Sequence, residues 1–207
     1  MDSASEQKIV LLTIEEFSAI YGNSEERYEL IDGIPYMMAA PATVHQGLSM
    51  FIGGELYNFL KGKKCRVFAA PCDVFLTESP RDEAGKVKVN KRVKGTVVQP
   101  DLVVICDEKK IKRDGCHGAP DLIVEILSES TKDKDTGVKF HKYHSSGVRE
   151  YWVIDPDEET IEVYGFKPGS RRYRAESYGF GDKVKSHVLD GLEIDFKEFG
   201  FDEQYEQ

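Results

Sequence analysis

Two apolar runs dominate the hydrophobic pattern of this chain, Val97 to Ile105 and Ala119 to Leu127. Their richness in Val, Ile and Leu predicts buried strands. Acids nevertheless interrupt both runs, at Asp101 in the first and at Asp121 and Glu125 in the second. Burying an unpaired charge is costly, so each acid is expected to be neutralised or to meet a cation. Two such strands in succession predict a shared metal ion.

The rest of the pattern alternates between helical and strand periodicity. Thr13 with Glu16 three residues later predicts a capping box at a helix start, and Asp32-Gly33 between apolar residues predicts a β-hairpin over 27–36. The other expected elements are a helix over 42–61, a strand over 66–76, a polar then basic loop over 77–96, strands over 97–106 and 120–127, a helix over 133–145, a strand over 149–155, and antiparallel strands over 160–166, 172–178 and 184–188. Periodicity alone therefore indicates a mixed α+β fold.

Composition indicates one ordinary soluble domain over residues 1–207. Hydrophobic residues make up 40% of the chain and charged residues 31%, and no apolar run approaches the roughly 20 residues of a membrane span. The polar start of the chain lacks the features of a secretory signal, so we expect a cytoplasmic location and no membrane partner. The four cysteines are then expected to be reduced, and their spacing fits no zinc motif.

The net charge of −9 argues against a protein that coats nucleic acid, because nonspecific affinity comes from Lys and Arg contacts to phosphates. It does not exclude a nuclease, whose acids gather a metal ion that then faces the phosphate. Local basic patches must then attract the substrate. The best nucleic-acid contacts by composition lie in the loop over 77–96: Lys86, Lys88, Lys91, Arg92 and Lys94.

Asp101 and Glu125 are the best candidates for metal ligands. They lie 24 positions apart (125 minus 101), which leaves room for one strand to end and a neighbour to return. If the two strands are adjacent, about 4.8 Å apart, both carboxylates can reach one divalent ion. Asp121 shares a face with Glu125 but sits about 13 Å away along the strand. Asp121 is therefore expected to bond backbone amides at the strand start.

Several motifs together resemble a known family. Pro100-Asp101, Glu125 and a following lysine resemble the PD-(D/E)XK nuclease signature, except that Leu127 stands two positions after Glu125 where that signature has Lys. Over roughly 12–195 the chain resembles the Uma-two family of restriction-endonuclease-like proteins. The strings that carry this resemblance are Tyr28-Glu29-Leu30-Ile31-Asp32-Gly33, the helix with His45, Pro100-Asp101-Leu102, Pro120 to Ser128, Lys139 to Tyr143, and Gly147 to Pro156.

The resemblance implies both a fold and an activity. It implies an αβββαβ core with an N-terminal β-hairpin and a C-terminal β extension. It also implies Mg²⁺-dependent cleavage of DNA, with Mn²⁺ as a substitute ion, by a homodimer. Asp101 and Glu125 match the metal ligands, Lys139 on the following helix matches the missing lysine, and Glu29 is grouped with the catalytic residues. The backbone carbonyl of Ile126 completes the expected set.

Each candidate also has a structural interpretation. Asp101 can cap a turn after Pro100, Glu125 can be the buried partner of an arginine or tyrosine, and Glu29 can pair on an exposed hairpin. Lys139 can belong to a solvated lysine face with Lys132, Lys134 and Lys142, and the basic loop can simply be solvated.

Two further side chains and the function itself also have alternatives. His45 can contact a phosphate, support the ligands, or be a satisfied core histidine, and Asp73 can lie near the site. Tyr143, Tyr151 and Trp152 are expected in the core. The alternative functions are a catalytically silent nucleic-acid or protein binding module, and a hydrolase of RNA or a small phosphoester.

Overall fold

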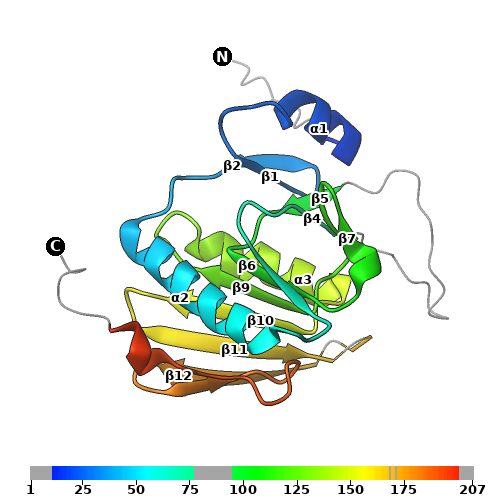
Figure 1. Cartoon of the computed structure of the whole chain (residues 1–207). Helices are drawn as coiled ribbons and strands as arrows, with labels where there is room; N and C mark the ends of the chain where they lie inside the picture. The colour runs from blue at the N-terminus through cyan, green and yellow to red at the C-terminus, as the bar shows by residue number, and fades with distance from the viewer. Residues whose placement is uncertain (1–10, 77–94, 168, 171, 201–207) are drawn as a thin grey trace.

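The structure, a computed structural model, describes residues 11–76, 95–167, 169–170 and 172–200. Its central sheet has six strands in the order β12-β11-β10-β9-β6-β3 (Figure 1). β9 and β10 are parallel, and the other neighbours are antiparallel. The bounds of these strands are β3 Arg66–Ala69, β6 Leu102–Ile105, β9 Leu122–Ile126, β10 Glu150–Asp155, β11 Thr160–Phe166 and β12 Tyr173–Gly179.

Helices cover both faces of the central sheet (Figure 1). On β9, Val124 and Ile126 pack into the cluster that contains the buried face of α2, whereas Ile123 packs with Tyr143 of α3 on the other face. This alternation follows from the period of two in a strand. Within the described ranges, no helix has the length and apolar character to cross a membrane. The helical segments are α2 Thr43–Leu60, the π-helical η2 Lys134–Lys139 and α3 Phe140–Ser146.

A second sheet lies beside the first, with strands in the order β2-β1-β5-β4-β8-β7. α1, Ile14–Tyr21, packs its buried Phe17 against Leu30 and Val97 of this sheet. The remaining elements are β1 Tyr28–Ile31, β2 Ile34–Met37, β4 Val74–Leu76, β5 Thr96–Val98, η1 Glu108–Lys110, β7 Ile111–Lys112, β8 Gly115–His117, β13 Lys183–Lys185, β14 Glu193–Asp195 and η3 Phe196–Phe199.

The expected core order is present as α2, β3, β6, β9, α3 and β10, which confirms the αβββαβ succession. The hairpin around Asp32-Gly33 forms β1 and β2, and Thr13 with Glu16 forms the predicted capping box. β11, β12 and β13 form the C-terminal β extension at positions close to those expected.

Two expected strands are wrong as continuous elements. Residues 66–76 divide into β3 in the central sheet and β4 in the second sheet, and residues 97–106 divide in the reverse order, into β5 in the second sheet and β6 in the central sheet. Pro71 lies in the first break and Pro100 in the second. Proline has no N–H to donate, so a ladder cannot continue through it undisturbed. The second break leaves Asp101 just before β6.

The expectation of reduced cysteines is wrong for one pair. Cys65, just before β3, and Cys106, just after β6, form a disulfide. Cys72 and Cys116 are free thiols, and burial raises the pKa of Cys116 to about 11. Cys116 is fully buried, so it packs as a small apolar side chain.

Candidate active site

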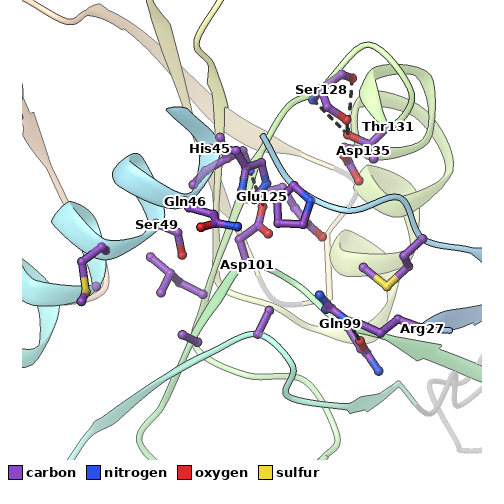
Figure 2. A pocket seen from close by; sticks show the side chains of 18 of the residues that line it. Arg27, His45, Gln46, Ser49, Gln99, Asp101, Glu125, Ser128, Thr131 and Asp135 are labelled. Carbon is purple, nitrogen blue, oxygen red and sulfur yellow. Dashed lines mark hydrogen bonds and ion pairs between the residues drawn. The ribbon is translucent and has the colours of Figure 1, made fainter. Parts of the chain in front are cut away.

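A pocket of about 640 Å³ lies beside α2, from His45 to Tyr57, where segments of both sheets meet (Figure 2). All four side chains predicted to be catalytic line it: Glu29, Asp101, Glu125 and Lys139. His45 lines it as well. Glu29 and Lys139 are 110 positions apart (139 minus 29), so the fold brings the pocket together from distant segments.

Asp101 and Glu125 face each other across neighbouring strands. β6 and β9 pair Leu102 with Val124, so the next position places Asp101 opposite Glu125. Oδ2 of Asp101 accepts a hydrogen bond from the N–H of Ile126 at 2.7 Å and lies 3.1 Å from Nε2 of His45. The two carboxylates therefore meet at one wall of the pocket.

His45 is held against this pair from α2. Burial lowers the pKa of His45, but the hydrogen bond and charge of Asp101, with a backbone hydrogen bond to Ile126, outweigh burial and raise the pKa above its ordinary value. His45 is thus a partner of the predicted ligand Asp101 rather than an isolated core histidine.

Lys139 occupies the centre of a buried group of acids. Its Nζ lies 2.8 Å from Oε1 of Glu29, 2.9 Å from Oε1 of Glu125 and 3.1 Å from Oδ1 of Asp135. None of these four side chains is more than 5% exposed. Burial lowers the pKa of Lys139, but the charges of Glu125, Glu29 and Asp135 outweigh it and raise this pKa well above its ordinary value. Lys139 is therefore a fixed cation.

Tyr143 and Tyr151 close the inner side of this group. The hydroxyl of Tyr143 donates to Oε1 of Glu125 at 2.6 Å, and that of Tyr151 donates to the carbonyl of Asp135 at 3.1 Å. Burial and the charge of Glu125 raise the pKa of both phenols well above the ordinary range. Both tyrosines are fully buried, as expected, and both are permanent donors.

Glu29, His45, Asp101, Glu125, Asp135 and Lys139 together form one set, the acid network. Four carboxyl groups meet one ammonium and one imidazole, so with every carboxyl group ionised and His45 protonated the set would carry two excess negative charges (four minus two). Burial raises the pKa of Glu125 well above its ordinary range despite the attraction of Lys139, and burial also raises the pKa of Asp135. The network therefore favours an additional proton or cation.

A second chain of polar contacts reaches the pocket through Gln99. Its backbone N–H donates to Oε1 of Glu29 at 2.9 Å, and its side chain accepts from Nε of Arg27 at 2.9 Å and donates to Asp73 at 2.7 Å. Asp73 thus supports the site without entering the acid network, and burial raises its pKa. One guanidinium nitrogen of Arg27 is buried without a hydrogen-bond partner among the described residues.

The other predicted residues lie elsewhere. Asp121 accepts from the N–H of Cys106 at 2.7 Å and pairs with Arg149, which is the structural role expected of it. Lys132 pairs with Asp155 and Lys142 with Asp32. The basic loop residues Lys86, Lys88, Lys91, Arg92 and Lys94 lie outside the described ranges.

Sequence reasoning missed Asp135, Arg27 and Gln99. Asp135 carries one usable signal, since it stands four positions before Lys139, a spacing that suits an ion pair on a helix. Arg27 and Gln99 carry none, because they meet across two strands that are joined only by the tertiary fold.

The donor set suits a hydrated magnesium ion. Among the described residues, no group of three or more His, Cys, Asp or Glu side chains is arranged to hold a metal. Mg²⁺ in phosphate chemistry is commonly bound by one or two carboxylates and keeps several waters. In the described part of the chain, the contacts of Asp101 fall on Oδ2 and those of Glu125 on Oε1. Their other oxygens remain for such a ligand.

Comparison with known proteins matches this chain to a family model, to a relative of known sequence and to solved structures. Residues 14–197 match the family model Uma2, described as "Putative restriction endonuclease". An uncharacterized protein of Synechocystis sp. is 25% identical over 154 residues, which cover 74% of this chain and 73% of that protein.

The crystal structure of a "putative nuclease belonging to DUF820" from Anabaena variabilis matches with a TM-score of 0.68 at 19% identity, over 91% of this chain and 97% of that one. At this identity the likeness concerns the fold alone. It confirms the mixed α+β architecture with a restriction-endonuclease-like core.

Proposed function

The chain belongs to the Uma2 family, and from that premise we propose that it is a Mg²⁺-dependent endonuclease that hydrolyses the phosphodiester bonds of DNA. The family description and the structural neighbour support a nuclease. The metal ion, the DNA substrate and the roles of the residues given below are the proposal.

The excess of negative charge in the acid network is the observation that carries it. Burying three acids around one lysine is unfavourable for stability, because each charge without a partner is costly to bury. Such an arrangement is typical of sites that receive a cation or hold a proton for chemistry. Asp101 and Glu125 are the two members that face each other at the pocket wall, so we assign the metal to them.

The chain's own residues position the reacting groups. Bound to Asp101 and Glu125, Mg²⁺ would lower the pKa of a water and stabilise negative charge on the phosphate. Tyr143 and Lys139 hold Oε1 of Glu125, and the N–H of Ile126 holds Oδ2 of Asp101. Lys139 also supplies a fixed positive charge next to the scissile phosphate, where preorganised charge is most effective. Glu29 keeps Lys139 in place from β1.

DNA, and a second copy of the chain, are the partners that we propose. A homodimer would supply one active site for each strand of a duplex. The loop with Lys86, Lys88, Lys91, Arg92 and Lys94 would provide phosphate contacts that the overall charge of −9 does not. Sedimentation with and without DNA measures the oligomeric state directly.

Calorimetric titration of Mn²⁺ and Mg²⁺, followed by a cleavage assay on plasmid and oligonucleotide DNA, tests the proposal. We expect metal binding and cleavage in the wild type, and loss of both in Asp101→Asn. Asp121→Asn is the matched control, because Asp121 is an acid on the same sheet that bonds a backbone N–H away from the pocket. Full cleavage by purified Asp101→Asn would refute the assignment.

The binding module on the same fold stays the alternative. Its supporting observation is Lys139, whose ammonium is already engaged by three carboxylates instead of lying free in the pocket. DNA binding in a gel shift without cleavage in either Mg²⁺ or Mn²⁺ would favour that alternative. Cleavage that requires Lys139 would exclude it.

A further inference from the structure

The pocket extends from the acid network along an unusual face of α2. The buried side of α2 is aliphatic. On the side that lines the pocket, Met50 is 78% exposed and Tyr57 is 62% exposed. Figure 2 shows Gln46 and Ser49 of this face beside Asp101. The surface, here named the α2 groove, consists of Gln46, Ser49, Met50, Gly53, Gly54 and Tyr57 of α2, opposite Val67, Ala69 and Ala70.

Gly54 lines the α2 groove at a point where no other part of the described chain packs against the helix. A glycine inside a helix makes the helix less stable than an alanine would. Such a glycine is often explained by a neighbouring segment that packs too closely for a Cβ. A Cβ on Gly53 would lie 3.2 Å from Leu102, which is tight, whereas one on Gly47 would make an ordinary contact at 3.5 Å from Phe199. A Cβ on Gly54 would meet nothing within 4 Å. The bare backbone at Gly54 therefore leaves room for a ligand and not for another part of the described chain.

The chemistry of the α2 groove suits bases and not phosphates. None of its six α2 side chains carries a formal charge, although binding to a DNA backbone depends on Lys and Arg. Exposed aromatic side chains, by contrast, stack on the bases of single strands. The groove runs from Gln46 to Tyr57, a rise of about 16 Å for eleven helical residues. That length accommodates a few nucleotides.

The depth of the acid network points to the same substrate. Glu125 is only 5% exposed at the side chain, so a phosphate can approach it only from within the pocket. The bases of a duplex are paired and stacked, and removing them from the stack is easiest when the strand is already single. A phosphate on an unpaired strand can enter the pocket while its neighbouring bases lie along α2.

We propose that the α2 groove binds the bases of an unpaired DNA strand, with Tyr57 as a stacking platform and Gly54 as the point of closest approach. This inference rests on the proposed nuclease function and narrows its substrate to single-stranded DNA or an unpaired segment within a duplex.

A fluorescence binding assay without metal tests the groove. Its ligand is a short oligodeoxynucleotide that contains one 2-aminopurine, used either as a single strand or in a duplex. We expect tighter binding of the single strand, with quenching of 2-aminopurine on stacking. Tyr57→Ala should weaken binding about tenfold, whereas Tyr57→Phe should bind like the wild type because it keeps the ring. Gly54→Ala should weaken binding several-fold, whereas Gly47→Ala, on the same helix but outside the groove, should not.

Thermal unfolding separates ligand effects from folding effects. Both Gly→Ala variants should melt at or above the wild-type temperature, because alanine favours the helix. Unchanged single-strand binding in both Gly54→Ala and Tyr57→Ala, or tighter binding of the duplex, would overturn the groove assignment even if DNA is cut. If the wild type binds the single strand, if Gly54→Ala and Tyr57→Ala weaken this binding, and if no cleavage occurs in Mg²⁺ or Mn²⁺, the nuclease function is overturned instead.

A second copy of the chain is the other candidate occupant of an exposed apolar groove. Sedimentation of the same variants decides between the two occupants. If Tyr57→Ala dissociates a dimer and leaves oligonucleotide binding intact, the groove is a subunit interface and the inference fails. An unchanged oligomeric state with weakened oligonucleotide binding supports it.

Discussion

Glu125 and Glu150 are both buried, and they lie on neighbouring parallel strands, β9 and β10. Glu150 is surrounded by neutral donors: Trp152 Nε1 at 2.6 Å from Oε1, and the N–H groups of His187 and Val188 at 2.6 and 2.9 Å from Oε2. Glu125 is surrounded by other acids, one lysine and a tyrosine. Burial is common to both, so burial alone does not distinguish a functional acid.

The difference lies in how each charge is compensated. Three fixed N–H donors satisfy the oxygens of Glu150 and leave its side chain no need for a ligand. At Glu125 the surrounding acids oppose the charge, and burial raises its pKa well above the ordinary range. A buried acid with satisfied hydrogen bonds ties the fold together, whereas a buried acid among acids retains the capacity to take up a cation or a proton.

Glu125→Gln should produce the largest effect. We expect Mg²⁺-dependent cleavage to fall by about 10³-fold or more, since several kcal/mol of charge stabilisation depend on a metal carboxylate. The fold should persist, because the change removes an acid whose charge is opposed by its surroundings. Cleavage kinetics and circular dichroism measure both results. Glu150→Gln is the matched control and should cleave like the wild type.

Lys139→Met should destabilise the protein by about 3 kcal/mol, because it leaves Glu29, Glu125 and Asp135 buried without their cation. The loss should shrink as the pH falls, since burial raises the pKa values of Glu125 and Asp135, which then take up protons. Urea unfolding at several pH values measures this dependence. A Lys139→Met protein as stable as the wild type at neutral pH would show that the lysine does not compensate the acid network.

Glu150→Gln should reduce stability by about 1–3 kcal/mol without loss of activity. The new amide NH₂ must face either the indole N–H of Trp152 or the backbone N–H groups of His187 and Val188. A donor is then left against a donor in a buried site. The denaturant midpoint measures the change, and an unaltered midpoint would mean that the segment with His187 adjusts freely.

Asp155→Asn, at the end of β10, should have the smallest effect, because its partner Lys132 is half exposed. Burial raises the pKa of Asp155, but its bonds to Lys132 and to the N–H groups of Asp157 and Glu158 outweigh burial and lower this pKa below its ordinary value. The stabilisation is therefore present above the unfolded-state pKa and is lost as the pH falls through the lower folded-state pKa.

Thermal melting of the wild type and Asp155→Asn from neutral to acidic pH measures this contribution. The two melting temperatures should differ slightly near neutral pH and converge in acid. High salt should also reduce the difference, because Lys132 is half exposed. A constant difference across the pH range would indicate that the charge of Asp155 is not involved.

Local pattern was sufficient for much of the fold. The capping box at Thr13, the hairpin at Asp32-Gly33 and the helix α2 each depend on neighbouring residues, and each forms as predicted. The strands 66–76 and 97–106 were predicted as single elements because apolar runs continue past Pro71 and Pro100. Which sheet each half joins depends on distant partners, which a local pattern does not contain.

The chain's sequence by itself determined that Asp101 and Glu125 interrupt two apolar, strand-forming runs, since apolar flanks are a local property. That β6 and β9 pair and place the two acids opposite each other was decided by the tertiary structure. Only the tertiary structure decided that Lys139 and Asp135 enter the same network, that Gln99 links it to Arg27, and that Glu150 is satisfied elsewhere. The physical reason is that the compensation of a buried charge is a sum over neighbours in space, and most of those neighbours are distant along the chain.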